Sequence, residues 1–267
     1  MELSTVLNLV DKTLKPQKSV QFDISKEQTT IFDCKIGGIP YFPKNMKYPT
    51  KNTNKEPLIL LAQLNFEQIP HIPYFPKKGI LQFFISQDDC YGMNFNDLMN
   101  QNEFRIIYHK DIITDTTQLI DSLNFEIDYN ELPYKGEYKL IPNEITTMYA
   151  DPYTEEFMDL FVDKYNDLYT PNIKSIFGLT DELSEQIYTR NDRKKAFIGG
   201  YPIFTQNDPR YEKRYMNCKI VLFELDSLYN QDIDIMWGDC GTGTFLISKD
   251  NLKKLDFSKV IFNYDCC

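Results

Sequence analysis

The chain has 267 residues, of which 42% are apolar and 25% are charged, and its formal net charge at pH 7 is −10. These proportions are typical of a globular protein with a substantial core. No apolar run approaches the roughly 20 residues that a membrane-spanning helix needs, and the acidic balance argues against binding to nucleic-acid phosphate. The composition therefore predicts neither a membrane nor a nucleic acid as partner.

Cysteine and histidine usage predicts neither a metal site nor a cofactor. The six cysteines form no Cys-x-x-Cys pair, and His71 and His109 stand at no ligand-like spacing from them. The first residues, 1–7, lack the basic segment and the long apolar stretch of a secretion signal. We therefore expect a cytoplasmic protein.

The N-terminal part predicts one helix followed by strands. Apolar residues at helical spacing predict a helix over residues 3–14, which ends before Pro16. Alternating or continuous apolar patterns typical of β-structure then predict strands at 20–24, 58–64, 79–86, 104–109 and 125–129.

The middle of the chain is acidic and helical. An apolar stripe from Phe157 to Leu168 predicts a helix that Pro171 stops, and a second helix is expected over 180–188. Between residues 144 and 190 there are ten acidic side chains and three basic ones. Such a connector would attract a basic protein or peptide. The alternative is a solvated face that keeps the protein soluble.

Four segments of the N-terminal part recur in the C-terminal part in the same order. Lys-Ile-Gly-Gly-Ile-Pro-Tyr-Phe around Gly37 matches Phe-Ile-Gly-Gly-Tyr-Pro-Ile-Phe around Gly199. Likewise, the sequence pairs residues 59–65 with 220–226, 79–86 with 241–248, and 105–111 with 259–265. This pattern predicts an internal duplication.

The predicted fold class is α+β, within a single domain over 1–267. Two similar β-rich halves, about 20–140 and 191–267, pack together, and the acidic helical segment 144–190 connects them.

The two Gly-Gly-x-Pro turns are the sharpest candidates for a ligand-facing loop, because paired glycines permit positive φ and close backbone approach. A tight turn that begins each half is the alternative. We expect a binding cleft between the halves, with these candidate residues: Gly37, Gly38, Pro40, Gly199, Gly200, Pro202, Gln206, Asp208, Arg210, Trp237 and Asp239.

The C-terminal candidates carry different chemistry. Gln206, Asp208 and Arg210 offer acceptor and guanidinium groups that suit a peptide backbone or a carboxylate. The alternative is an Asp-Pro turn in which Arg210 bonds to Asp208. The single Trp237 would either floor the cleft or plug the interface between the halves.

Enzyme motifs are absent from the sequence. It contains no Gly-x-Ser-x-Gly elbow, no His-Glu-x-x-His and no glycine-rich dinucleotide fingerprint. A hydrolase with a carboxylate site at Asp111, Asp239 or Asp265 is the enzymatic alternative. The sequence favours a protein without catalysis.

Several of these segments together resemble the YwqG-like family of bacterial proteins, a domain of unknown function. The segments are Gly37-Gly38-x-Pro40, Pro57-Leu58-x-Leu60-Leu61-Ala62-Gln63-Leu64-Asn65, Gly79-x-Leu81-Gln82-Phe83-Phe84, Gly200-Tyr201-Pro202-x-Phe204-Thr205-Gln206-x-Asp208-Pro209-Arg210 and Trp237-Gly238-Asp239-x-Gly241.

That family is distantly similar to the eukaryotic programmed cell death protein 2 group, whose members act as chaperones of a ribosomal protein. The inserted metal-binding finger of those relatives has no counterpart in this sequence. The resemblance implies a protein-interaction module that binds a protein or peptide and is chaperone-like. An immunity-type protein that neutralises a toxin is the alternative.

Overall fold

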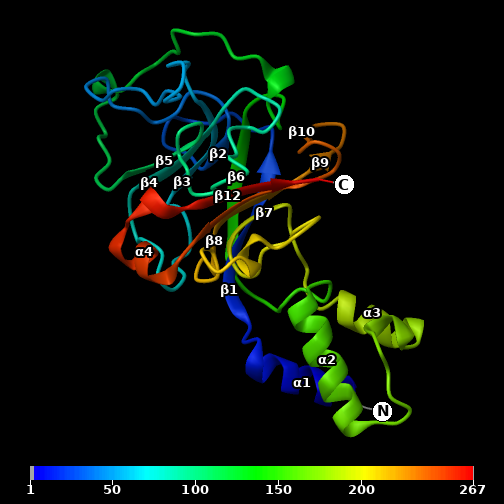
Figure 1. Ribbon diagram of the computed structural model, residues 1–267. Helices are drawn as coiled ribbons and strands as arrows, with labels where there is room; N and C mark the ends of the chain where they lie inside the picture. The colour runs from blue at the N-terminus through cyan, green and yellow to red at the C-terminus, as the bar shows by residue number, and fades with distance from the viewer. Residues whose placement is uncertain (1–2, 267) are drawn as a thin grey trace.

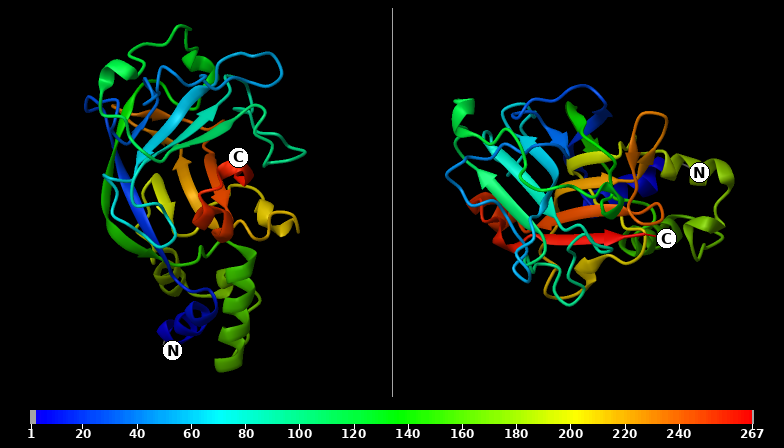
Figure 2. Two further views of the ribbon diagram at one scale, coloured as in Figure 1. Left: turned by 90° about the vertical axis from the view of Figure 1, so that its left-hand side faces the viewer. Right: turned by 90° about the horizontal axis from the view of Figure 1, so that it is seen from above.

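The computed structural model describes residues 3–266, and its largest element is a curled antiparallel sheet (Figure 2). The predicted domain 1–267 includes Met1, Glu2 and Cys267, and the N-terminal segment 1–7 includes the first two of them. These three residues lie outside the described residues. Within residues 3–266, ten strands form this sheet in the spatial order β12-β11-β8-β7-β1-β6-β2-β3-β4-β5.

The strands of the sheet, in chain order, are β1 (Gln17–Ser25), β2 (Lys35–Ile36), β3 (Ile59–Asn65), β4 (Ile80–Ile85), β5 (Arg105–His109), β6 (Tyr138–Met148), β7 (Ala196–Gly199), β8 (Ile220–Asp226), β11 (Thr242–Ile247) and β12 (Ile261–Asp265). A separate small ladder joins β9 (Leu228–Tyr229) to β10 (Asp234–Ile235).

Three helices lie together at one end of the molecule, away from the sheet (Figure 1). They are α1 (Leu3–Thr13), α2 (Glu155–Leu168) and α3 (Asp181–Tyr188), whereas α4 (Lys249–Lys254) follows β11. Thr154 caps α2 by accepting a hydrogen bond from the backbone N–H of Phe157. None of the helices in residues 3–266 combines the length and the apolar character that crossing a bilayer requires.

The helical end has an apolar core of its own. Val6 and Val10 of α1 share a buried cluster with Phe157 and Phe161 of α2. The acidic side chains of α2 and α3, such as Glu156, point to solvent. The predicted helices are therefore confirmed in position, and the N-terminal helix packs with the connector. Overall, a curled antiparallel sheet with separate helices fits the α+β class.

The inside of the curl is filled by apolar side chains from distant parts of the chain. Phe83 of β4 packs against Phe223 of β8 and Phe245 of β11, with ring centroids 5.3 and 4.8 Å apart. All three rings belong to one buried cluster that draws on strands from both sides of the sheet. A packed core therefore occupies much of the space in which the sequence analysis expects a cleft.

The strand order reads as two mirrored sets around a central pair, β1 and β6. β2 lies beside β6 as β7 lies beside β1, and β3, β4 and β5 follow outward on one side as β8, β11 and β12 follow on the other. We call β2, β3, β4 and β5 the first half, and β7, β8, β11 and β12 the second half. All of these neighbours are antiparallel.

Both halves carry an irregularity at the same place. The ladder between β3 and β4 skips Leu61, and the ladder between β8 and β11 skips Leu222. Leu61 and Leu222 are equivalent positions in the matched segments of the sequence. A bulge leaves one residue unpaired and increases the local twist. Both ladders therefore bend at equivalent points.

The fourth predicted match is out of register by two residues. Ile80 of β4 faces His109 in β5, and the equivalent Thr242 of β11 faces Asp265 in β12. Asp265 is therefore the structural counterpart of His109, whereas the sequence match equates it with Asp111. A shift of two residues keeps each side chain on the same face of a strand, so the apolar pattern does not detect it.

Two further segments differ from the sequence prediction. Tyr138–Met148 forms the central strand β6, which the sequence analysis does not predict and whose last residues it assigns to the connector. Residues 125–129 form no strand. Instead, Phe125 and Ile127 lie in a loop and pack, partly buried, against the main core. Alternating apolar residues can anchor a loop to a core as well as form a strand.

Candidate functional site

The first Gly-Gly turn follows β2 directly and packs against the start of β6. Gly37 and Gly38 have φ of +67° and +71°. A Cβ atom at Gly37 would lie 2.5 Å from the carbonyl oxygen of Gly136, and one at Gly38 would collide with the carboxylate of Glu137. Glycine is therefore required at both positions, and at Gly38 it makes room for a charged group.

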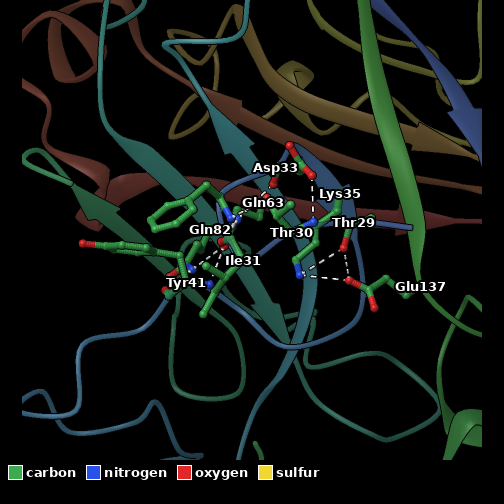
Figure 3. Close-up of polar contacts among 10 residues, drawn as sticks. Thr29, Thr30, Ile31, Asp33, Lys35, Tyr41, Gln63, Gln82 and Glu137 are labelled. Atoms are coloured by element: carbon green, nitrogen blue, oxygen red, sulfur yellow. Dashed lines mark hydrogen bonds and ion pairs between the residues drawn. The ribbon is translucent and has the colours of Figure 1, made fainter. Parts of the chain in front are cut away.

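A buried lysine binds that carboxylate, as Figure 3 shows. Lys35, in β2, has a side chain only 3% exposed, and its Nζ lies 2.9 Å from Oε1 of Glu137. The hydroxyl of Thr29 also donates to Oε1, and Nζ donates to Thr29 Oγ1 at 3.4 Å. Both described hydrogen bonds of Glu137 thus use Oε1. Oε2 has no described partner, and the Glu137 side chain as a whole is 40% exposed.

A cavity of about 300 Å³ lies at this cluster. It is lined by Thr29, Thr30, Ile31, Lys35, Ile39, Thr116, Ile120, Asp121 and Glu137. Ile39 is the variable residue of the first Gly-Gly-x-Pro motif, so this turn does face a cavity. Two carboxylates and one ammonium give the lining an excess of one negative charge. We call this the turn cavity.

A buried amide network lies in the sheet beside the turn cavity. Gln63 Oε1 accepts from the backbone N–H of Tyr41 at 2.8 Å and from Gln82 Nε2 at 2.9 Å. Gln82 Oε1 lies 2.9 Å from Nε2 of His109. An amide oxygen only accepts, so Nε2 of His109 carries the proton. Burial lowers the pKa of His109 to about 4, which keeps the imidazole neutral near pH 7.

The second Gly-Gly turn has the same backbone conformation in different surroundings. Gly199 and Gly200 both have φ of +66°. A Cβ atom at Gly199 would collide with the carbonyl oxygen of Lys18, and one at Gly200 would collide with Met148. Phe197 stands where the first half has Lys35. This turn therefore packs against β1 and the end of β6.

The buried network of the second half is centred on a carboxyl group. Glu224 lies opposite Thr244, as Gln63 lies opposite Gln82. It accepts from the backbone N–H of Ile203 at 3.2 Å and from the Thr244 hydroxyl at 3.3 Å. Burial raises the pKa of Glu224 to about 8, although Arg193 opposes the rise, so the carboxyl group is mainly protonated near pH 7.

The remaining predicted binding residues make contacts within the protein. Arg210 forms an ion pair with Asp208 at 2.5 Å, the predicted structural alternative. The backbone N–H of Gln206 donates to Asp265 Oδ2 at 3.0 Å. Trp237 is fully buried, with its ring 5.1 Å from that of Tyr91. Pro40 and Pro202 are buried, whereas Asp239 is exposed. The Trp237 ring thus lies within the main buried cluster.

The three carboxylates of the hydrolase alternative have unrelated surroundings. Asp111 is exposed and pairs with Lys78 at 2.7 Å, Asp239 is exposed, and Asp265 is buried in β12. No described hydrogen bond joins any two of them. Among residues 3–266, no group of three or more His, Cys, Asp and Glu side chains is placed to hold a metal ion.

Sequence reasoning missed the charged residues of the turn cavity. Lys35 is not among the predicted binding residues, although the first of the two matched segments has this lysine where the second has Phe197. Glu137 and Thr29 lie 102 and 6 residues from Lys35 along the chain. A lysine within a short apolar strand is a signal that the sequence offers. The identity of its partner Glu137 is not, because the two residues lie 102 positions apart.

Comparison with known proteins gives a family but no characterised relative. No curated protein matches the chain. A family model described as Domain of unknown function (DUF1963) matches residues 34–266, which span the strands from β2 to β12 and the helices α2 to α4. This range covers both Gly-Gly turns and every residue of the turn cavity from Lys35 onward. The chain therefore belongs to the family of domains of unknown function DUF1963.

Proposed function

We propose that this protein is a non-catalytic interaction module that binds a basic segment of a partner protein or peptide in the turn cavity. The observation that carries the proposal is the charge of the cavity. Glu137 and Asp121 line the cavity together with a single ammonium, that of Lys35, which already binds Oε1 of Glu137. A cationic side chain from a partner would bind the free Oε2 and the Asp121 carboxylate.

The size and the lining of the cavity also favour binding of a side chain. About 300 Å³ is at the lower end of the range for small-molecule sites, and it accommodates one long side chain more easily than a cofactor. Ile31, Ile39 and Ile120 would contact the aliphatic part of a lysine or arginine, while Thr29 and Thr116 offer hydroxyl acceptors.

The helices α2 and α3 also support a basic partner. The acidic side chains of α2 and α3 are exposed, and of the ion pairs described in these helices only that between Lys164 and Asp167 neutralises one of them. A field of this sign raises the association rate of a positively charged partner and weakens with added salt. The helices would thus steer the partner, and the turn cavity would hold it.

We also propose that the fold arose by internal duplication, within a bacterial, cytoplasmic, YwqG-like lineage. The mirrored strand order, the matching bulges at Leu61 and Leu222 and the shared φ values of Gly37 and Gly199 support this. On this proposal the two turns began alike, and the first half alone gained a charged cavity.

The binding proposal is tested with peptides of known sequence. An acetylated and amidated Gly-Gly-Arg-Gly-Gly is titrated into ¹⁵N-labelled protein, beside the same peptide with glutamine or glutamate at its centre. We expect the arginine peptide to bind most tightly, with chemical-shift changes centred on the turn cavity. The Asp121→Asn variant should weaken its binding by about 3- to 5-fold, the value of one exposed charge pair, and Glu137→Gln should weaken it further.

The matched control is Glu126→Gln, which removes the same charge from an exposed position outside the cavity lining. It should leave the affinity unchanged. Equal binding of the arginine and glutamine peptides would overturn the proposal, and so would full affinity of the Asp121→Asn and Glu137→Gln variants.

A further inference from the structure

A second cavity lies where the two ends of the sheet approach each other. It has a volume of about 530 Å³ and is lined by Asn52, Gln101, Asn102, Arg105, Ile106, Tyr108, Leu255, Phe257 and Ser258. The first six residues belong to the first half or its loops, and the last three to the segment between β11 and β12. We call this the closure cavity.

The curl brings these two edges together through specific contacts. The backbone N–H of Phe262 in β12 donates to the carbonyl oxygen of Leu98 at 3.0 Å. Gln101 donates through Nε2 to the carbonyl oxygen of Phe257 at 2.7 Å and accepts from the N–H of Ile106 at 3.0 Å. The walls of the closure cavity are therefore fixed relative to each other by hydrogen bonds, although β5 and β12 are opposite ends of the sheet.

Arg105 gives this cavity a positive charge without a counter-charge. Its Nε lies 3.4 Å from the carbonyl oxygen of Phe104, and its Nη2 lies 3.3 Å from Oδ1 of Asn52. Both contacts are long, and both acceptors are uncharged. Among residues 3–266, no carboxylate forms an ion pair with Arg105, and its Nη1 has no described hydrogen bond. The planar fork of a guanidinium is suited to two parallel hydrogen bonds from a carboxylate.

Another part of the lining is aromatic and apolar. The rings of Tyr108 and Phe257 lie 5.4 Å apart and are tilted by 55°. Ile106 and Leu255 complete this part of the lining. The hydroxyl of Tyr108 donates to the carbonyl oxygen of Lys78 at 2.8 Å, so this hydrogen bond fixes the position of the ring. A flat apolar group would gain contact area and ring packing against this wall.

We propose that the closure cavity binds a small carboxylate whose body is an aromatic ring, with Arg105 pairing the carboxylate and the Tyr108–Phe257 wall contacting the ring. This site is independent of the turn cavity and takes a ligand of opposite charge. A ligand held there contacts both ends of the sheet, so it stabilises the closed curl and raises the unfolding temperature.

The test uses a set of fragments that separates charge from ring. Benzoate carries both features, benzamide lacks the charge, acetate lacks the ring, and phenyl phosphate offers a different oxyanion. In titrations of ¹⁵N-labelled protein we expect benzoate to bind with a millimolar dissociation constant, as befits a fragment of about nine heavy atoms. Benzamide and acetate should each bind at least 5-fold more weakly, with phenyl phosphate no tighter than benzoate.

Three variants assign the site. Arg105→Gln removes the charge and should lower benzoate affinity at least 10-fold. Asn102→Asp adds a carboxylate to the lining and retains the acceptor of the 2.6 Å hydrogen bond from Asn52 Nδ2, so the fold is kept while benzoate affinity falls about 5-fold. Arg214→Gln is the matched control, because Arg214 pairs with Glu212 and does not line the cavity.

The outcomes are decisive in both directions. Chemical-shift changes at the closure cavity, loss of binding in Arg105→Gln and Asn102→Asp, and a rise in unfolding temperature with benzoate support the proposal. Equal affinity for benzoate and benzamide, full affinity in Arg105→Gln, or shift changes away from Tyr108 and Phe257 would overturn it. Tighter binding of phenyl phosphate would replace the carboxylate by a phosphate ligand and so contradict the proposal as stated.

Discussion

At the first Gly-Gly turn Lys35 and Glu137 line a cavity, whereas at the second turn Phe197 and Met148 occupy the corresponding surroundings. The glycines have nearly the same φ in both places, and each turn is pressed against a strand of the central pair. The backbone is thus held constant while the side chains around it differ. A repeated turn is therefore a structural requirement, and binding chemistry depends on what its neighbours supply.

The buried networks of the two halves differ in the same manner. Gln63 and Glu224 occupy equivalent positions, and each accepts a hydrogen bond from the backbone beyond its turn. The first network contains His109 with a lowered pKa, and the second contains Glu224 with a raised one. The two networks thus make the stability of the protein depend on pH in opposite directions.

The strongest test of the comparison is to replace the first glycine of each turn. Gly37→Ala and Gly199→Ala each force a left-handed residue and push a Cβ atom into a backbone carbonyl. The left-handed conformation alone costs about 1–2 kcal/mol, and we expect a total loss of about 4 kcal/mol in the free energy of unfolding for each variant. Urea denaturation measures both. A loss below about 1 kcal/mol in only one of them would mean that the turns are not equivalent.

The next largest effect is a pH dependence of the stability, which Glu224 in the second half causes. The folded pKa of Glu224 is raised to about 8 from 4.5, so the folded state retains a proton that the unfolded state releases. Stability therefore falls as pH rises from about 5 to 8, by about 3 kcal/mol. Glu224→Gln places the residue of the first half at this position and should remove that fall. Thermal unfolding between pH 5 and pH 9 measures it.

His109 supplies the control for this experiment. Its folded pKa is lowered from 6.5 to about 4, so stability is present above pH 6.5 and is lost as pH falls toward 4. The Glu224→Gln variant should keep this acid-side loss, and His109→Gln should reduce it. A Glu224→Gln variant that still loses stability between pH 5 and 8 would show that another group causes the fall.

A smaller effect on stability distinguishes Lys35 from Glu137, the two partners of the ion pair in the turn cavity. Glu137→Gln leaves the Lys35 ammonium buried beside a neutral amide, and we expect it to cost about 1–2 kcal/mol, less than a fully buried pair because Glu137 is 40% exposed. Lys35→Met leaves a carboxylate that water reaches, so its cost should stay below about 1 kcal/mol. Chemical denaturation of both variants gives the order, and the reverse order would contradict the described burial.

The sequence predicted the strands of the matched segments more reliably than the central strand β6. The matched segments located β3, β4, β8 and β11, because continuous apolar strands covered on both faces leave a clear pattern. β6 was missed because Pro142 and Glu144 interrupt any alternation. Its partners in β1 lie more than 100 residues away, as in the pairing of Val20 with Ile145.

The candidate site was predicted only in part, for a related reason. Local spacing identified Gly37 and Gly38, since positive φ is a property of the turn itself. Whether a turn faces a cavity depends on residues brought to it by the fold, and Glu137 reaches it from β6. The role of Arg105 in the closure cavity could likewise not be predicted from the sequence. Its lack of a counter-charge depends on which residues the fold brings to the two ends of the sheet.

The smallest expected effect concerns the carboxylates that the sequence equated. Asp111 is exposed and forms one surface ion pair, so Asp111→Ala should change the free energy of unfolding by less than about 0.5 kcal/mol. Asp265 is buried and accepts from the N–H of Gln206, so Asp265→Ala should cost about 1 kcal/mol more. Parallel urea titrations measure the difference. Equal costs would restore the predicted equivalence and contradict the two-residue shift in register, which places Asp265 opposite Thr242 and leaves Asp111 beyond the end of β5.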